Sequence, residues 1–292
     1  GLLHFFLGLE IKQSSSGIFI SQQKYARELL KRFRMQKANS VHTPVSVGLK
    51  LSKDDKSELI DPTRFRSLVG SLMYLTATRP DIAYGVSLIS RYMESPRKSH
   101  WEAGKRILRY IQGTCSEGIF YKKVQYPKLI RYCDSDWEGD QDDSKSTSGN
   151  VFFVGSGAIS WMSKKQVVVA LSTAEAEYIS LALTGCQALW ITWVLQELKQ
   201  PFKDCPEIYC DNKSAIALSK DPVLHGKSKH IRIKYHFIRD LIKNGEISVK
   251  YCTSQNQISD IFTKPLKSEV FSELKTKHAF MHFSCSVGIM AI

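Results

Sequence analysis

The sequence lacks a hydrophobic run long enough to span a membrane, and no targeting segment is expected in it. Its seven cysteines are odd in number and include no Cys-x-x-Cys pair, which disfavours a disulfide framework and a zinc site and favours a reducing compartment. The longest apolar run, near residues 151–162, is interrupted by Gly and Ser and is too short to span a bilayer, so no membrane contact is expected. The chain begins at Gly1 and not at Met, which predicts a piece of a longer polypeptide.

Positive charge is in excess, and it is unevenly placed. The formal net charge is +13, and 43% hydrophobic with 11% aromatic residues is enough for the cores of one large or two modest domains. Residues 1–123 carry 21 Lys and Arg against 10 Asp and Glu, whereas residues 124–292 carry 20 against 18. A basic excess is often only a solvated surface, but this asymmetry favours nucleic-acid binding by the first part.

The first part predicts a hairpin followed by helices. Two strand-like runs, 3–11 and 17–20, are separated by a Ser/Gly turn, and residues 21–34 have the pattern of a basic amphipathic helix. No carboxylate pair or Ser/His arrangement stands out, so binding rather than catalysis is expected here. Beyond a polar loop near 39–60, further helices are predicted at 62–76, 80–93 and 99–112.

The order of elements changes near residues 122–128, which marks a predicted boundary. Strand-like runs followed by alternating helices and strands favour a mixed sheet covered by helices. The longest predicted helix covers residues 174–198, and Gly185 within it marks a position where a helix break is considered. A basic loop covers 221–234. The predicted strands are 128–135, 148–155, 157–163, 206–211 and 246–252, and the shorter helices are 212–219, 235–244 and 258–263.

Acidic residues stand at several of these element ends. Asp134 and Asp211 come at the ends of strand-like runs, Asp260 opens a short helical segment, and Glu175 and Glu177 lie at the start of the long helix. Carboxylates gathered from such ends would hold two divalent cations. The plainer interpretation is that these are ordinary surface acids among the 28 present.

Spacing leaves two alternatives open. Asp136 would share a strand face with Asp134. Glu175 and Glu177 point in different directions on a helix, so at most one of them is a natural ligand.

Many ordered motifs run along the chain. Those of the second part are YCDSDWEG (132–139), STSG (146–149), AISWMSKKQ (158–166), LSTAEAEY (171–178), CDNKSA (210–215), KHIRIKYHFIR (229–239) and SDIFTKPL (259–266); those of the first are FLGLEI (6–11) and SLMYLTATRPDI (71–82). Over about residues 1–275 these motifs resemble copia-type retrotransposon polyproteins. The second part resembles their ribonuclease H domain, and the first part resembles the reverse transcriptase just after its catalytic palm hairpin, with its thumb and connection. Residues 278–292 do not match the usual end of the family.

The resemblance implies an α/β fold of the α+β kind: a ribonuclease H-like mixed five-stranded sheet flanked by helices, preceded by a hairpin and a mainly helical thumb/connection. It implies four parts: residues 1–20 as a remnant of the palm hairpin, 21–123 as thumb/connection, 124–265 as the ribonuclease H-like domain, and 266–292 as a C-terminal tail. The paired Asp motif of the palm is absent from this sequence, so DNA polymerisation is not expected.

The resemblance also implies a catalytic and metal-binding role for Asp134, Glu177, Asp211 and Asp260, and so selects Asp134 over Asp136 and Glu177 over Glu175. These acids would hold two Mg²⁺ ions, which Mn²⁺ can replace, for hydrolysis of the RNA strand of RNA–DNA hybrids. A His that often precedes the last Asp in ribonucleases H is absent from residues 253–259, so no product-release residue is identified.

Nucleic-acid contacts are expected beside the acids and in the basic loop. Ser172 and Thr173 are also natural helix caps, and both roles are compatible. In the loop, a basic patch suits the phosphate backbone. The complete set of expected contact residues is Ser172, Thr173, Asn212, Lys213, Lys229, His230, Arg232 and Lys234.

The leading hypothesis is thus a ribonuclease H endonuclease that forms the C-terminal part of a retrotransposon reverse transcriptase. Its expected partners are an RNA–DNA hybrid and the rest of the Pol polyprotein. The expected location is cytoplasmic, in a virus-like particle, with the nucleus as the alternative. The rival is a catalytically idle remnant that only binds nucleic acid; a strand-transfer enzyme is rejected because that class usually ends its acid series with Glu on a helix after two Asp.

Overall fold

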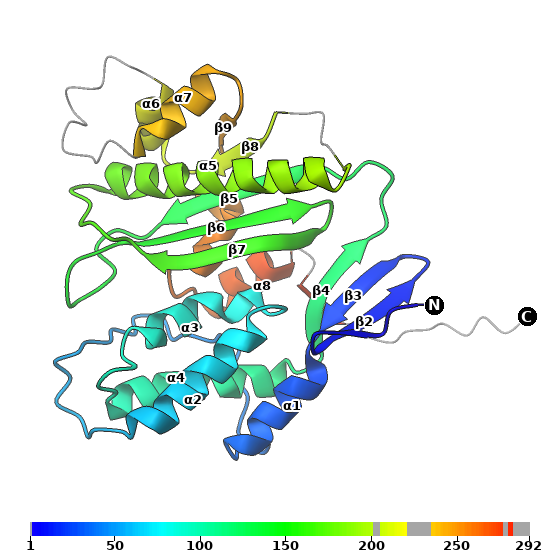
Figure 1. Ribbon diagram of the computed structural model, residues 1–292. Helices are drawn as coiled ribbons and strands as arrows, with labels where there is room; N and C mark the ends of the chain where they lie inside the picture. Colours follow the sequence, from blue (N-terminus) through cyan, green and yellow to red (C-terminus); the bar gives the residue numbers. More distant parts are fainter. Residues whose placement is uncertain (1, 201–204, 221–234, 277–279, 283–292) are drawn as a thin grey trace, which may run out of the picture.

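The computed structural model describes residues 2–200, 205–220, 235–276 and 280–282, and these residues form two five-stranded sheets with helices around them (Figure 1). The first sheet is antiparallel throughout, in the order β1-β2-β3-β4-β10. The predicted hairpin is confirmed, because β2 and β3 pair across a tight turn. The strand β4, which pairs with β3, was not predicted from the sequence. The bounds are β1 (Phe5–Phe6), β2 (Leu9–Ser14), β3 (Gly17–Ser21), β4 (Glu117–Lys122) and β10 (Phe280–His282).

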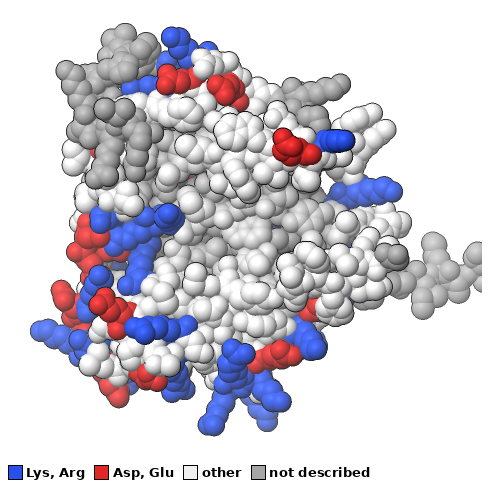
Figure 2. Space-filling view, viewed as in Figure 1, with Lys and Arg blue, Asp and Glu red and all other residues white. Residues whose placement is uncertain are grey.

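Helices fill the first part of the chain between β3 and β4, as predicted. Asp61 begins α2 by accepting a hydrogen bond from the backbone N–H of Thr63 at 2.9 Å, with Pro62 at the first helical position. Lys and Arg side chains gather over α1 and the neighbouring helices, whereas the middle of the same face is largely uncharged (Figure 2). The elements are α1 (Gln23–Arg32), α2 (Pro62–Leu75), the 3₁₀ turn η1 (Pro80–Ile82), α3 (Ala83–Ser90) and α4 (Lys98–Gly113).

The second sheet is mixed, in the order β7-β6-β5-β8-β9. The strands β5, β6 and β7 pair antiparallel, whereas β5, β8 and β9 pair parallel. This arrangement confirms the expected mixed five-stranded sheet. Its strands are β5 (Leu129–Ser135), β6 (Thr147–Val154), β7 (Gly157–Lys165), β8 (Glu207–Cys210) and β9 (Ser248–Tyr251); the helices are α5 (Thr173–Glu197), α6 (Lys213–Lys220), α7 (Phe237–Lys243) and α8 (Ser268–Thr276), with 3₁₀ turns η4 (Ser254–Asn256) and η5 (Ile258–Phe262).

The long helix α5 runs without a break through Gly185, contrary to the break considered from the sequence. A Cβ at this position would lie 2.5 Å from Cδ1 of Ile238 on α7, so the glycine lets the two helices approach closely. By length and composition α5 could cross a membrane, but half of its most apolar window is buried in the protein. It packs on β5 and β6 as a core helix.

The second sheet lies between two layers. Phe152 on β6 joins the core under α5, whereas its neighbours Val151 and Phe153 join the core on the opposite face, as alternation along a strand requires. That opposite core also contains Phe65 and Leu72 of α2. The predicted thumb/connection and ribonuclease H-like regions therefore share one continuous hydrophobic core.

The predicted C-terminal tail is in part a packed helix. Phe271 and Leu274 of α8 are buried in the shared core. Lys275 donates to Glu117 of β4 at 2.6 Å and to the Tyr110 hydroxyl at 2.9 Å. Residues 268–276 thus belong to the fold, because an amphipathic pattern too short to be noticed in the sequence finds a ready apolar surface.

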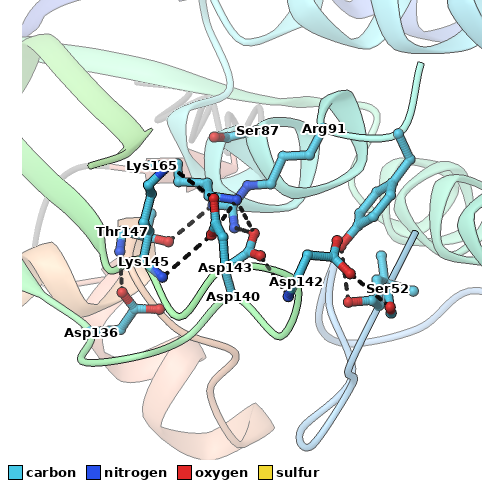
Figure 3. A network of polar contacts seen from close by, with 12 residues as sticks. Ser52, Ser87, Arg91, Asp136, Asp140, Asp142, Asp143, Lys145, Thr147 and Lys165 are labelled. Carbon is cyan, nitrogen blue, oxygen red and sulfur yellow. Dashed lines mark hydrogen bonds and ion pairs between the residues drawn. The ribbon is translucent and has the colours of Figure 1, made fainter. Parts of the chain in front are cut away.

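An acidic loop, residues 136–146 between β5 and β6, fastens the sheet to the helical region (Figure 3). The Asp140 carboxylate accepts from Arg91 at 3.0 Å and pairs with Lys165 at 2.7 Å. Asp142 accepts from the Ser52 hydroxyl at 2.7 Å. Since Asp140 is buried and both of its partners are largely covered, this loop holds the two regions in one relative position.

Candidate metal centre

Three of the four acids converge at one edge of the second sheet. Asp134 is near the carboxyl end of β5, and Asp211 directly follows the parallel neighbour β8. Glu177 extends from the second turn of α5, which packs on β5. One carboxylate oxygen from each lies within 4.8 Å of the others. Asp134 and Glu177 are buried and Asp211 is half-buried, so the three carboxyl groups lie together with restricted access to water.

The fourth acid, Asp260, is connected to Asp134 by Lys264, whose ammonium lies near both carboxylates. Asp260 on η5 forms an ion pair with Lys264 at 2.9 Å, and the same ammonium lies 3.6 Å from Oδ2 of Asp134. The Thr263 hydroxyl donates a short hydrogen bond to the same Asp134 oxygen. Thus η5 and the residues after it supply an acid, a hydroxyl and a cation to one side of Asp134.

Crowding of buried carboxylates shifts their protonation. Burial, then the Asp134 carboxylate and the Cys210 thiol, raise the pKa of Glu177 well above its usual range. Burial and Asp134 raise the pKa of Asp260 to about 8, against the opposing effect of Lys264. Burial alone would lower the pKa of Lys264, but the two carboxylates outweigh it and that pKa is raised.

The donor set fits a hard divalent cation. All four acids offer carboxylate oxygens, the ligands that Mg²⁺ and Mn²⁺ prefer over nitrogen and sulfur. A cation at Asp134, Glu177 and Asp211 would relieve the mutual repulsion that raises the pKa of Glu177. The residues present therefore suit the metal that the sequence resemblance implies.

The two alternative acids are engaged elsewhere. The Asp136 carboxylate accepts a short hydrogen bond from the backbone N–H of Thr147, and burial raises its pKa to about 7 although that bond opposes the rise. The Glu175 carboxylate accepts from the backbone N–H of Leu171 at 2.8 Å, while Ser172 accepts from the N–H of Glu175 at 3.2 Å. Glu175 is therefore part of a reciprocal helix cap.

Of the eight expected nucleic-acid contact residues, four lie in the described part of the chain. Ser172 caps α5, and Thr173 beside it is exposed. Asn212 accepts from the backbone N–H of Ala215 at 2.9 Å, at the start of α6. The Lys213 ammonium lies 4.9 Å from the centre of the Tyr251 ring. The rest lie outside the described residues: Lys229, His230, Arg232 and Lys234.

Sequence reasoning missed the residues that support the acids. The Ser254 hydroxyl donates to Asp211 at 2.9 Å. The Gln257 amide donates to the backbone carbonyl of Cys133 at 2.9 Å and reaches the other Asp211 oxygen at 3.5 Å. Of these supporting residues, only Thr263 and Lys264 could have been singled out from the sequence, because both lie in the SDIFTKPL motif beside Asp260.

The topology and the acidic edge define a ribonuclease H-like domain: a mixed sheet in the order β7-β6-β5-β8-β9, with a long helix across it. No family model matches the chain. It is 42% identical over 290 residues to the "Retrovirus-related Pol polyprotein from transposon RE2" of Arabidopsis thaliana, which covers 99% of this chain and 19% of that protein. It is 41% identical over 286 residues to the corresponding polyprotein from transposon TNT 1-94 of Nicotiana tabacum, which covers 94% of this chain and 21% of that protein.

The chain therefore matches a fragment of copia-type retrotransposon Pol polyproteins, and it spans about a fifth of the length of these relatives. Among solved structures, it is similar to LC11-RNase H1 in complex with an RNA/DNA hybrid, with a TM-score of 0.32 and 13% identity over 47% of this chain and 94% of that one.

Proposed function

We propose that this chain is a ribonuclease H endonuclease that hydrolyses the RNA strand of RNA–DNA hybrids with two divalent cations, as the C-terminal part of a retrotransposon reverse transcriptase. The observation that carries the proposal is the convergence of Asp134, Glu177 and Asp211 within 4.8 Å, from three separate elements. The similarity to Pol polyproteins over nearly the whole chain supports the polyprotein context.

The four acids would hold the cations, for which Mg²⁺ is the natural choice and Mn²⁺ a substitute. When bound, such ions lower the pKa of a water and stabilise the leaving oxygen of a phosphodiester. The chain's own residues position the ligands: Ser254 and Gln257 fix the two oxygens of Asp211, and Thr263 fixes one oxygen of Asp134. Fixed ligands reduce the reorganisation needed when substrate binds.

The proposed substrate would lie over the acidic edge, where Ser172 and Thr173 begin the helix that carries Glu177, and Asn212 and Lys213 directly follow Asp211. The ribose 2′-hydroxyl is the group that distinguishes the RNA strand to be cut. The basic first part would bind the rest of the duplex through its phosphates. The other proposed partner is the remainder of the Pol polyprotein, and the proposed location is a cytoplasmic virus-like particle or the nucleus.

The test is cleavage of a uniformly labelled RNA–DNA hybrid by the 292-residue chain in Mg²⁺, with single-stranded RNA and duplex DNA as substrate controls. We expect cleavage of the hybrid only, and loss of cleavage in Asp211→Asn. The matched control is Asp240→Asn, the same substitution at an exposed acid on α7, which should leave cleavage unchanged. If the hybrid is bound in a salt-dependent manner but never cut in Mg²⁺ or Mn²⁺, the chain is a binding remnant and the proposal is wrong.

A further inference from the structure

Lys264 is unusual among the charged residues around the centre. Among the described residues, it is the one cationic side chain within ion-pair distance of any of the four acids. Its ammonium lies 2.9 Å from Oδ1 of Asp260 and 3.6 Å from Oδ2 of Asp134. Glu177 and Asp211 have no such partner in that part of the chain. The positive charge of Lys264 is therefore directed at one half of the acidic group.

A second cation held by Asp134 and Asp260 would need carboxylate oxygens of the two residues that the ammonium now contacts. A Mg²⁺ ion binds carboxylate oxygens at about 2.0–2.1 Å, so an ion shared by Asp134 and Asp260 would lie within a few ångströms of the Lys264 ammonium. Two positive charges at that separation repel strongly in a partly buried site. A divalent cation bound by these two carboxylates and the Lys264 ammonium in its present position therefore exclude one another.

The other half of the group has no cationic side chain beside it in the described part of the chain. A first ion at Asp134, Glu177 and Asp211 meets three carboxylate oxygens within 4.8 Å of one another, and the ammonium contacts only one of these residues. A second ion must move the lysine first. The Lys264 side chain is 39% exposed, and its flexible four-carbon stem can turn towards water without disturbing η5.

From this geometry we infer that the Lys264 ammonium competes with the second divalent cation for Asp134 and Asp260, so that the metal centre fills in two unequal steps. The inference rests on the proposed function, and it names the residue that sets the metal concentration at which the centre is complete. Lys264 is thus a regulator of metal occupancy and not a metal ligand.

The test is a Mn²⁺ titration of the 292-residue chain without nucleic acid, in which the free ion is followed by electron paramagnetic resonance. In the wild type we expect one strong and one weak binding step. In Lys264→Met the dissociation constant of the second step should fall by about tenfold or more, because a nearby unit charge is removed. The first step should change much less, and Lys264→Arg should keep the second step weak.

The matched control is Lys267→Met, which removes the same charge from an exposed lysine three residues along the chain. It should bind Mn²⁺ as the wild type does. Thermal unfolding in EDTA and in Mn²⁺ provides a second readout. In EDTA, Lys264→Met should unfold at a lower temperature than the wild type, because Asp134 and Asp260 lose their counter-charge. Addition of Mn²⁺ should raise the unfolding temperature of Lys264→Met by more than it raises that of the wild type.

The outcomes separate the two proposals. If no variant binds any divalent cation and the hybrid is not cut, the proposed function fails. If two ions bind and the hybrid is cut, but Lys264→Met has the second dissociation constant of the wild type, only the inference about Lys264 is overturned. A weaker second step in Lys264→Met would overturn it as well, since Lys264 would then support metal binding.

Discussion

The acids that are expected to bind metal should destabilise the metal-free protein as the pH rises from acidic to neutral values and beyond. The pKa of Asp260 is raised to about 8 in the folded chain, whereas an exposed Asp has a pKa of about 3.9. Between these values the unfolded chain has released a proton that the folded chain retains. The contribution of Asp260 to the free energy of unfolding is therefore fully present below about pH 4 and is lost as the pH rises to about 8.

The size of the effect follows from linkage. Each pH unit between the two pKa values costs about 1.4 kcal/mol, so Asp260 alone would lower the free energy of unfolding by about 4 kcal/mol between pH 5 and pH 8. Asp136 and Glu177, whose pKa values are also raised, act in the same direction. In Asp260→Asn this cost disappears, but so does the ion pair with Lys264, and we expect a net gain of about 2 kcal/mol at pH 8.

The assay is urea unfolding in EDTA at several pH values from 5 to 8, followed by circular dichroism. The wild type should lose stability across this range, and Asp260→Asn should have a smaller slope. Glu94→Gln, at an exposed carboxylate, is the control and should follow the wild type. Saturating Mg²⁺ should flatten the wild-type slope, because bound ions favour the ionised carboxylates. A wild-type stability that is constant or rises from pH 5 to pH 8 in EDTA would refute the reasoning.

Two further predictions concern stability away from the centre. Arg131 on β5 is fully buried with no hydrogen-bond partner for its guanidinium among the described residues, and burial lowers its pKa to about 10. Arg131→Met should therefore raise the free energy of unfolding by about 2 kcal/mol. A lower free energy of unfolding in urea would contradict this prediction. Asp140→Ala leaves the charges of Arg91 and Lys165 without their buried partner, so it should lower the free energy of unfolding by about 3 kcal/mol, whereas an unchanged urea midpoint would show that the acidic loop does not fasten the two regions.

The sequence predicted elements best where the pattern is local. The strands that carry Asp134 and Asp211 are short apolar runs with clear ends, and their positions were predicted to within a residue or two. The catalytic and metal-binding roles of the four acids stay predictions. Asp136 could not be excluded by spacing, because its hydrogen bond with Thr147 depends on the pairing of β5 with β6.

Features that depend on distant partners were missed. The strand β4 becomes recognisable only when β3, about 100 residues earlier in the sequence, pairs with it. The contact of Lys264 with Asp134 joins residues 130 positions apart. At Gly185 local propensity favours a helix break, but packing against Ile238 outweighs it. In each case tertiary contacts decide, and these are absent from any local window.

The shared core has a consequence for how such elements evolve. Val151 and Phe153 of the second sheet are packed in one cluster with Phe65 and Leu72 of the preceding helices, and Tyr121 donates to the Ala158 carbonyl at 2.6 Å across the predicted boundary. A recombination breakpoint near residue 124 would combine core residues from two elements that evolved separately. Side chains whose volumes do not match would then meet in one core. These two regions should therefore be inherited together, with compensating substitutions on the two sides of the junction, more often than they are exchanged between lineages.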